Sequence, residues 1–130
     1  MKFNAIVGNP PYQVMDGGAK ASATPIYNEF VNIAKKLSPS FVSMIMPARW
    51  YAGGKGLDDF RENMISDTRM KCLIDFSNSA DCFPSLGNRS IKGGLCYFLW
   101  DKNYNGKCLI STMEQSKCIG TSFRFLKESN

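Results

Sequence analysis

Four consecutive residues near the amino terminus have the types and the order that could hold a planar amine. They are Asn9-Pro10-Pro11-Tyr12, and they follow the short apolar run Ala5-Ile6-Val7. Because Pro10 precedes a second proline, its backbone is restricted to an extended conformation, and its carbonyl is aimed by two locked rings. The amide oxygen of Asn9 adds a second acceptor, and Tyr12 offers a flat face on which a planar base can stack.

Two acceptors beside an aromatic ring suit an exocyclic amine. The amino nitrogen of adenine is a poor nucleophile because its lone pair is delocalised into the ring. Hydrogen bonds accepted from its N–H groups favour a more pyramidal nitrogen and direct the lone pair at an electrophile such as a methyl sulfonium. The sequence contains no histidine, which excludes Ser-His-Asp and Cys-His nucleophiles and histidine-ligated zinc. The alternative interpretation of residues 9–12 is a turn that ends a strand.

Strand-like and helix-like segments alternate along the chain. Apolar runs predict strands at residues 5–7, 41–46, 71–76 and 95–100. Helical spacing predicts a helix that begins with Thr24 as its N-cap and Pro25 as its first residue and that carries Tyr27 on its apolar, core-facing side. A second predicted helix carries Leu57, Phe60, Met64 and Ile65. This order predicts an α/β fold with a parallel sheet, in which ligands bind beyond the carboxyl ends of the strands.

The carboxyl-terminal part predicts a hairpin. Asn105-Gly106 is a hairpin signal between the strand at 95–100 and the run Cys108-Leu109-Ile110, so an antiparallel strand is expected at one side of the sheet. We therefore assign residues 1–112 to one domain and residues 113–130 to a tail or the start of a following segment.

Composition limits the class of protein. The chain has 130 residues, of which 44% are hydrophobic and 21% charged, which is typical of one compact domain, and its net charge of +5 suits an anionic partner. Its five cysteines are odd in number and widely spaced, which favours buried thiols over disulfides or a metal cluster, so no metal site is predicted. No apolar run approaches the roughly 18 residues of a membrane span, and we expect a cytoplasmic protein with no membrane partner.

The segment that runs from Ala5 to Tyr12 resembles the catalytic motif of the adenine-N6 DNA methyltransferases, which use S-adenosylmethionine. Similar motifs occur in enzymes that methylate protein glutamine and in some RNA methyltransferases. Three later stretches favour DNA over protein and RNA as the substrate, because they resemble the methylase part of bacterial restriction-modification enzymes: residues 45–50, 54–61 and 91–98. The resemblance implies part of a doubly wound, mostly parallel sheet of the S-adenosylmethionine-dependent methyltransferase type.

The resemblance also implies roles for individual residues. The catalytic residues would be Asn9, Pro10, Pro11 and Tyr12. Asn9 and the carbonyl of Pro10 would hold the adenine amine, and Tyr12 would stack on a base flipped from the duplex. The cofactor S-adenosylmethionine would contact Val7, Gly8 and Asn9. DNA would contact Arg49, Trp50, Lys55 and Lys92. The alternative for Arg49 and Trp50 is an aromatic cover over the sheet edge with a surface ion pair.

The chain departs from this family at its amino terminus. Members carry, ahead of the motif, a glycine-rich loop and an acidic residue that binds the cofactor ribose, whereas only a few residues precede Asn9 here. We therefore expect the second half of a methyltransferase domain that binds the cofactor weakly by itself. Its expected partners are DNA and either the missing first half or a second copy paired through the strand from Phe3 to Val7. Two other functions stay open: a protein glutamine methyltransferase and a non-catalytic nucleic-acid-binding fragment.

Overall fold

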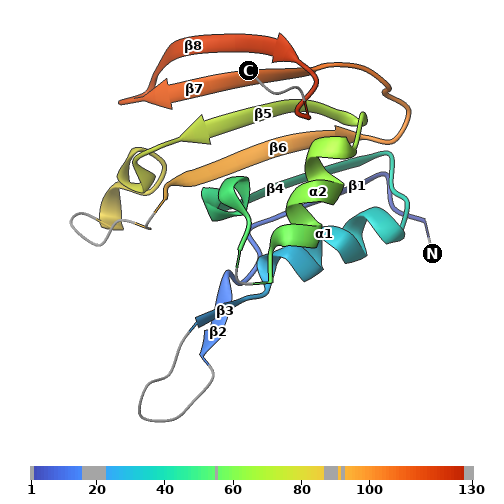
Figure 1. Cartoon of the computed structure of the whole chain (residues 1–130), viewed down its shortest axis with the longest axis horizontal. Coiled ribbons are helices and arrows are strands. Elements are labelled where there is room, and N and C mark those ends of the chain that lie inside the picture. Colours follow the sequence, from blue (N-terminus) through green and yellow to red (C-terminus); the bar gives the residue numbers. More distant parts are fainter. Residues whose placement is uncertain (1, 16–22, 55, 87–90, 92, 128–130) are drawn as a thin grey trace.

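The structure is a computed structural model that describes residues 2–15, 23–54, 56–86, 91 and 93–127 (Figure 1). It has two α-helices, eight strands and three short 3-10 helices (η) within these residues, in an alternating order. They are β1 Ala5–Gly8, β2 Gln13–Met15, β3 Ala23–Pro25, α1 Tyr27–Lys36, β4 Phe41–Pro47, η1 Ala48–Ala52, α2 Asp58–Ser66, β5 Met70–Phe76, η2 Ser79–Asp81, η3 Pro84–Leu86, β6 Leu95–Asp101, β7 Cys108–Glu114 and β8 Lys117–Arg124.

Six of the strands form one mixed sheet in the order β1-β4-β6-β5-β7-β8. β1 runs parallel to β4, and β5 runs parallel to β7, whereas β6 is antiparallel to both β4 and β5 and β8 is antiparallel to β7. Four strands therefore point one way and two point the other way. The α/β class is confirmed, and the carboxyl ends of β1, β4 and β5 meet at one edge of the sheet, where β6 begins.

The predicted hairpin at Asn105-Gly106 is wrong. β6 does not pair with β7 but lies between β4 and β5, and β7 pairs with the far side of β5. The backbone N–H of Gly106 donates instead to the carbonyl of Thr68, 3.0 Å away. β6 carries Phe98 and Trp100, which are 0% and 1% exposed, so this strand takes a central position where it is paired on both edges. The antiparallel hairpin at the end of the chain is formed by β7 and β8. The boundary predicted after residue 112 falls inside β7.

The predicted start of the first helix is also wrong. Thr24 and Pro25 belong to β3, which pairs with β2, and α1 begins at Tyr27 without a side-chain cap. The backbone N–H of Ile26 donates to the carbonyl of Tyr12, 3.1 Å away. The β2–β3 ladder thus brings the chain back beside the 9–12 segment before the helix begins, and this pairing outweighs the local preference for a helix start at Thr24.

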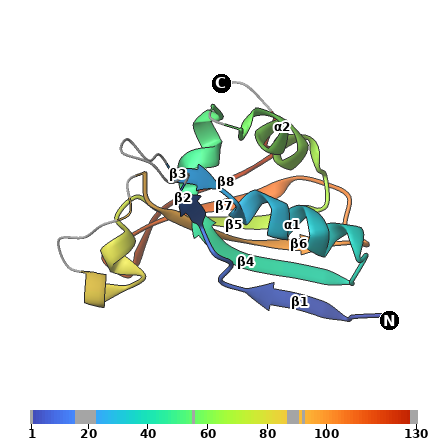
Figure 2. The same ribbon diagram turned by 90° about the horizontal axis from the view of Figure 1, so that it is seen from below.

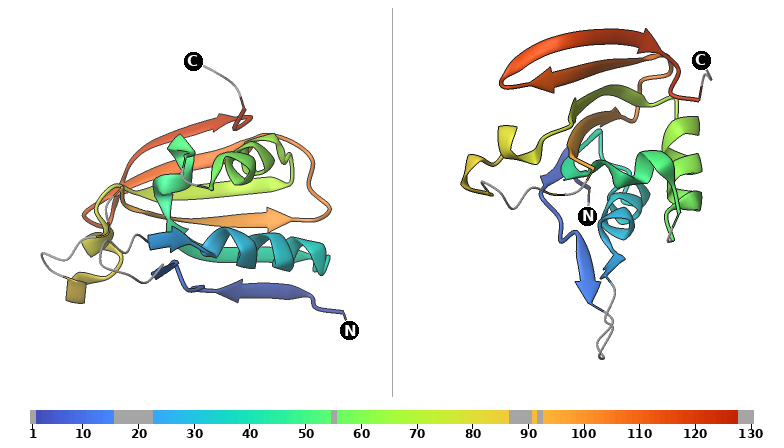
Figure 3. Two further views of the ribbon diagram at one scale, coloured as in Figure 1. Left: turned by 60° about the horizontal axis from the view of Figure 1, so that its bottom comes forward. Right: turned by 60° about the vertical axis from the view of Figure 1, so that its left-hand side comes forward.

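The core lies between the two α-helices and one face of the sheet. Both helices cover this face, as Figure 2 and Figure 3 show. The helices contribute buried side chains at helical spacing and the strands contribute every second residue. The central members are Tyr27, Val31, Ala34, Val42, Met44, Met46, Phe60, Met64, Cys96, Phe98 and Trp100.

The cysteines are free thiols in this fold, in agreement with their spacing. Cys96 and Cys108 are buried, whereas Cys118 is exposed on β8, so the prediction of buried thiols is wrong for Cys118. Among the described residues, no group of His, Cys, Asp and Glu side chains is arranged to hold a metal ion. Across the same residues, no helix is long and apolar enough to cross a membrane.

Candidate functional site

The 9–12 segment lines a cavity of about 820 Å³ at the carboxyl edge of the sheet. This volume lies within the range of about 300–1,000 Å³ that is usual for small-molecule sites. The segment follows β1, and the other walls come from β2 and β3, from the first residue of α1, from the end of β4 and η1, and from the residues just before α2 and β6. The lining residues are Asn9, Pro10, Pro11, Tyr12, Gln13, Pro25, Tyr27, Pro47, Arg49, Leu57 and Ile91.

The two predicted acceptors have no partner among the described residues. Within the described part of the chain, no group donates a hydrogen bond to the amide oxygen of Asn9 or to the carbonyl of Pro10. The neighbouring carbonyl of Tyr12 does accept one, from Ile26. Asn9 is exposed and Pro10 is half-buried at the cavity wall. Both oxygens are therefore available to a ligand.

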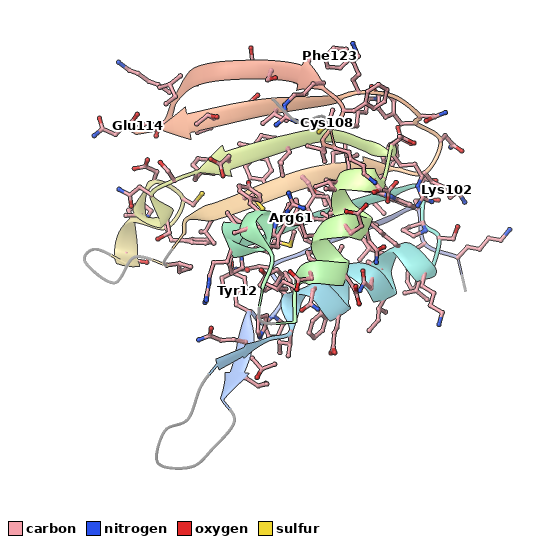
Figure 4. All side chains as sticks on the ribbon, in the orientation of Figure 1. Tyr12, Arg61, Lys102, Cys108, Glu114 and Phe123 are labelled. Carbon is pink, nitrogen blue, oxygen red and sulfur yellow. The ribbon has the colours of Figure 1, made fainter. Side chains whose placement is uncertain are left out.

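The ring of Tyr12 is held by other aromatic rings. It meets Tyr27 edge to face with centroids 6.4 Å apart, and Tyr27 meets Phe60 in the same way at 6.1 Å. Phe60 in turn contacts Trp50 at 5.8 Å. This row links the 9–12 segment to α1, α2 and η1, and Figure 4 shows Tyr12 beside α1. Burial raises the pKa of Tyr12 and raises that of Tyr27 to about 12, so both phenols are protonated at neutral pH.

Arg49 is the exposed cation at this cavity. It lies on η1, which directly follows β4, and it forms no ion pair with any described residue. The backbone N–H of Ala48 donates to the carbonyl of Gly94, 3.1 Å away, which fixes η1 against the start of β6. Among the residues that the structure describes, none forms the alternative surface ion pair with Arg49, so its guanidinium is exposed at the cavity.

Trp50, the residue after Arg49, is not exposed at the cavity. Its side chain is 1% exposed, and its indole N–H donates to the sulfur of Cys96, 3.4 Å away. The predicted contact between Trp50 and a displaced base does not fit this placement. Trp50 has a structural role at the site, because it packs against Phe60 and attaches η1 to the sheet through Cys96.

Tyr51 completes the attachment of η1. Its hydroxyl donates to Asp75 at 2.8 Å, and its carbonyl accepts a hydrogen bond from the Nε of Arg61 at 2.7 Å. Burial raises the pKa of Tyr51, so its hydroxyl keeps the proton and donates the hydrogen bond to Asp75. The carboxylate of Asp75 is thus engaged by the hydroxyl of Tyr51. Figure 4 shows Arg61 on α2, beside this loop.

Comparison with known proteins decides the family. Residues 1–83 match the family model of the Eco57I restriction-modification methylases. The chain belongs to this family. It is also 41% identical over 124 residues to an uncharacterized adenine-specific methylase of Mycoplasma pneumoniae, a match that covers 90% of this chain and 28% of that protein. The resemblance to a restriction-modification methylase is therefore confirmed, and the chain spans less than a third of that relative's length.

A solved structure has a similar fold. A chain from a study of complex assembly and conformational transition in a type I restriction-modification system superposes with a TM-score of 0.61 at 11% identity. The superposition covers 87% of this chain and 24% of the other chain. At this identity the likeness concerns the fold.

The remaining predicted site residues lie away from the cavity or outside the described residues. Val7 is 72% exposed on β1 at the edge of the sheet, and a Cβ at Gly8 would meet nothing within 4 Å. Neither residue lines the cavity. Lys55 and Lys92 lie outside the described residues. The structure thus brings together residues 9–12 and Arg49, and it adds Tyr27, which the sequence pattern placed only among core positions.

Proposed function

We propose that this chain holds the target adenine of a DNA adenine-N6 methyltransferase. The observation that carries the proposal is the pair of unengaged acceptors, Asn9 Oδ1 and the Pro10 carbonyl, beside Tyr12 in a cavity of about 820 Å³. Membership of a restriction-modification methylase family supports DNA as the substrate, and similarity to an adenine-specific methylase of Mycoplasma pneumoniae supports adenine as the base.

The proposed mechanism depends on positioning. The base must leave the duplex to reach the cavity, and there its 6-amino group donates one hydrogen bond to Asn9 and one to Pro10. Tyr12 stacks against the adenine ring, and the edge-to-face contact with Tyr27 holds the Tyr12 side chain in place. These contacts turn the nitrogen lone pair toward the incoming methyl group. The amine proton leaves to water after transfer, so no histidine is needed.

S-adenosylmethionine is the cofactor we propose, and it would supply an electrophilic methyl group on sulfur. The residues present fit one side of such a site: Val7 and Gly8 are exposed at the end of β1, next to Asn9, and nothing crowds Gly8. Val7, Gly8 and Asn9 would form the wall that separates cofactor from base. Since they lie on an edge strand, the opposite wall must come from another segment, and we expect weak cofactor binding by this chain alone.

DNA is the proposed macromolecular substrate. Arg49 lies at the cavity without an ion pair in the described residues, and the chain carries a net charge of +5. An unpaired guanidinium beside the base site would neutralise a backbone phosphate and fix the register of the duplex. Contacts of Lys55 and Lys92 with the DNA backbone stay predictions.

The proposal includes a partner for β1. This strand is bonded to β4 along one edge, and its other edge carries no described strand. Unpaired edge groups favour the addition of a strand. We propose that the rest of the methylase pairs with β1, in preference to a second copy of this chain, because that addition also supplies the missing wall of the cofactor site.

A reconstitution experiment tests the function. The chain is mixed with the part of the Mycoplasma pneumoniae relative that lies outside the matching region, together with S-adenosylmethionine and genomic DNA, and N6-methyladenine is measured by mass spectrometry. We expect product with the native chain and with Asn63→Ala, an exposed asparagine on α2, and at least about 100-fold less with Asn9→Ala. Equal activity of Asn9→Ala, or methyl label on protein glutamine, would contradict the proposal.

A further inference from the structure

Gln13 is a polar residue at the cavity of the 9–12 segment, and the proposed mechanism does not use it. It begins β2, which pairs with β3 beside the start of α1 (Figure 1). Its direct partner in this antiparallel pair is Pro25, so the two side chains lie on the same face, and both line the cavity. Val14, the next residue, faces the opposite way and does not line the cavity. The register thus directs the side chain of Gln13 to the cavity.

The carboxamide of Gln13 is open to a ligand. The residue is exposed, and no group in the described part of the chain forms a hydrogen bond with its side chain. Its backbone is held in place, because the carbonyl of Tyr12 accepts a hydrogen bond from the N–H of Ile26, 3.1 Å away. The ring of Tyr12 is fixed in turn against Tyr27. A side chain with both a donor and an acceptor therefore extends from a backbone of defined position.

Adenine has more hydrogen-bonding atoms than the two proposed acceptors can serve. When Asn9 and the carbonyl of Pro10 hold the two amine hydrogens, the polar atoms left on the base are ring nitrogens, which accept hydrogen bonds. Two of them, N1 and N7, flank the amino group, one on each side. A buried acceptor that finds no donor lowers affinity, so selection of adenine is strongest when both flanks meet a donor.

The 9–12 segment supplies a donor for one flank only. The carboxamide of Asn9 carries an N–H beside its oxygen, and this N–H serves the ring nitrogen on its own side of the amine. The carbonyl of Pro10 has no such neighbour, because the next residue, Pro11, lacks a backbone N–H. The ring nitrogen on the Pro10 side must therefore receive its hydrogen bond from another residue of the cavity.

Two lining side chains outside this segment present donors that a ligand can reach. The hydroxyls of Tyr12 and Tyr27 are buried, with no surface left for a ligand. Gln13 and Arg49 are exposed, and both line the cavity. The guanidinium of Arg49 suits an anionic phosphate, whereas a neutral carboxamide suits a neutral ring nitrogen and costs less to remove from water. Gln13 is therefore the better donor for the base.

We propose that Gln13 reads the target base by donating its carboxamide N–H to the ring nitrogen that flanks the adenine amine on the side of Pro10. This inference rests on the proposed function and makes Gln13 a specificity-determining residue of the same site. Gln13 directly follows Tyr12, so one peptide bond joins the residue that stacks on the base to the residue that reads its edge. A base without that nitrogen leaves the donor unpaired and binds less tightly.

Ring-modified bases test this inference. Single-stranded oligonucleotides carry one adenine, 1-deazaadenine, 7-deazaadenine or 3-deazaadenine within a thymine run, and fluorescence anisotropy at low salt gives their affinities. The native chain should prefer adenine to the 1-deaza and 7-deaza bases by about fivefold each, as expected for one hydrogen bond. Gln13→Met, which keeps the length of the side chain without its donor, should lose one of these two preferences. The 3-deaza base is altered on the side away from the amine, controls for stacking, and should bind like adenine.

Variants at other positions serve as controls. Gln115→Met, in the exposed turn between β7 and β8, should keep both preferences. Arg49→Ala should weaken binding of every oligonucleotide alike and should also keep them. The inference is overturned if the native chain shows neither preference, if Gln13→Met keeps both, or if Arg49→Ala loses the one assigned to Gln13. Equal affinity of the native chain for adenine and for purine, which lacks the amine, would instead count against the proposed base site, so the two failures stay distinct.

Discussion

The rings of Tyr12 and Tyr27 meet edge to face, with centroids 6.4 Å apart and planes at 85°. This contact joins the 9–12 segment to the first turn of α1, so the aromatic wall of the cavity is placed by packing. The hydroxyl of Tyr12 is buried and has no hydrogen-bond partner among the described residues. The position of the ring therefore does not depend on that hydroxyl.

Tyr12→Phe should stabilise the free protein. It removes a buried hydroxyl that lacks a partner and keeps the ring contact with Tyr27, so the free energy of unfolding should rise by about 1 kcal/mol. Urea denaturation of the two proteins measures the difference. Tyr12→Ala, which also removes the ring, should lower stability. A clear loss of stability in Tyr12→Phe would show that the hydroxyl makes a hydrogen bond.

Gly94→Ala should destabilise the edge where β6 begins. Gly94 has φ of +81°, and a Cβ there would overlap the carbonyl oxygen of Phe76 and crowd the backbone of Ser77. We expect the free energy of unfolding to fall by at least about 2 kcal/mol. The matched control is Gly8→Ala, where a Cβ meets nothing within 4 Å, and its thermal midpoint should stay close to native.

Asp67 should carry much of the acid sensitivity of the fold. It accepts hydrogen bonds from Lys35 at 2.9 Å, from Arg69 at 2.8 Å and from the indole of Trp100 at 2.9 Å. Burial raises the pKa of Asp67, but the hydrogen bonds and charges of Arg69 and Lys35 outweigh it and lower the pKa to about 2. Since the unfolded value is 3.8, this stabilisation is complete above pH 3.8 and is lost as the pH falls toward 2.

Asp67→Asn should therefore flatten the pH dependence of unfolding between about pH 4 and pH 2. It should also lower stability at neutral pH by about 3 kcal/mol, because Lys35 stays mostly buried without its anion. Denaturant titrations at several pH values test both effects. Glu62→Gln, which breaks an exposed pair with Lys127, is the control and should leave the curve unchanged. An equally steep acid transition in Asp67→Asn would contradict this account.

Arg49→Ala should weaken DNA binding without changing sequence preference. If its guanidinium contacts one phosphate, the slope of log affinity against log salt should fall by about 1, and binding should weaken to a similar degree for every duplex. Lys107→Ala, an exposed cation beyond β6, is the matched control. An unchanged slope in Arg49→Ala would place the phosphate contact elsewhere. Fluorescence anisotropy at several salt concentrations gives these slopes.

Local signals predicted the centre of the site. An apolar strand, two adjacent prolines and the chemistry of Asn9 and Tyr12 are all encoded within eight residues, so the 9–12 segment could be placed at a strand end from the sequence. The helix at Asp58–Ser66 was predicted from the same kind of local periodicity, and the structure confirms it. Neither feature depends on which strands are neighbours.

Long-range pairing accounts for the errors. The insertion of β6 between β4 and β5 is a contact between distant segments, and no turn signal encodes it. Trp50 and Arg49 are adjacent, and only the attachment of η1 to Cys96 and Gly94 decides that one is buried and the other exposed. Tyr27 was predicted on the buried side of a helix, but its place beside Tyr12 required the β2–β3 ladder.

The central claim is that Asn9 and Pro10 grip the 6-amino group of adenine, and base substitution tests it most directly. Short single-stranded oligonucleotides carry one adenine, or one purine that lacks the amino group, within a thymine run, and their affinities are measured at low salt. We predict that the native chain prefers adenine by about tenfold or more, as expected for two hydrogen bonds, and that Asn9→Ala loses most of this preference. Equal affinity of the native chain for adenine and purine would contradict the claim.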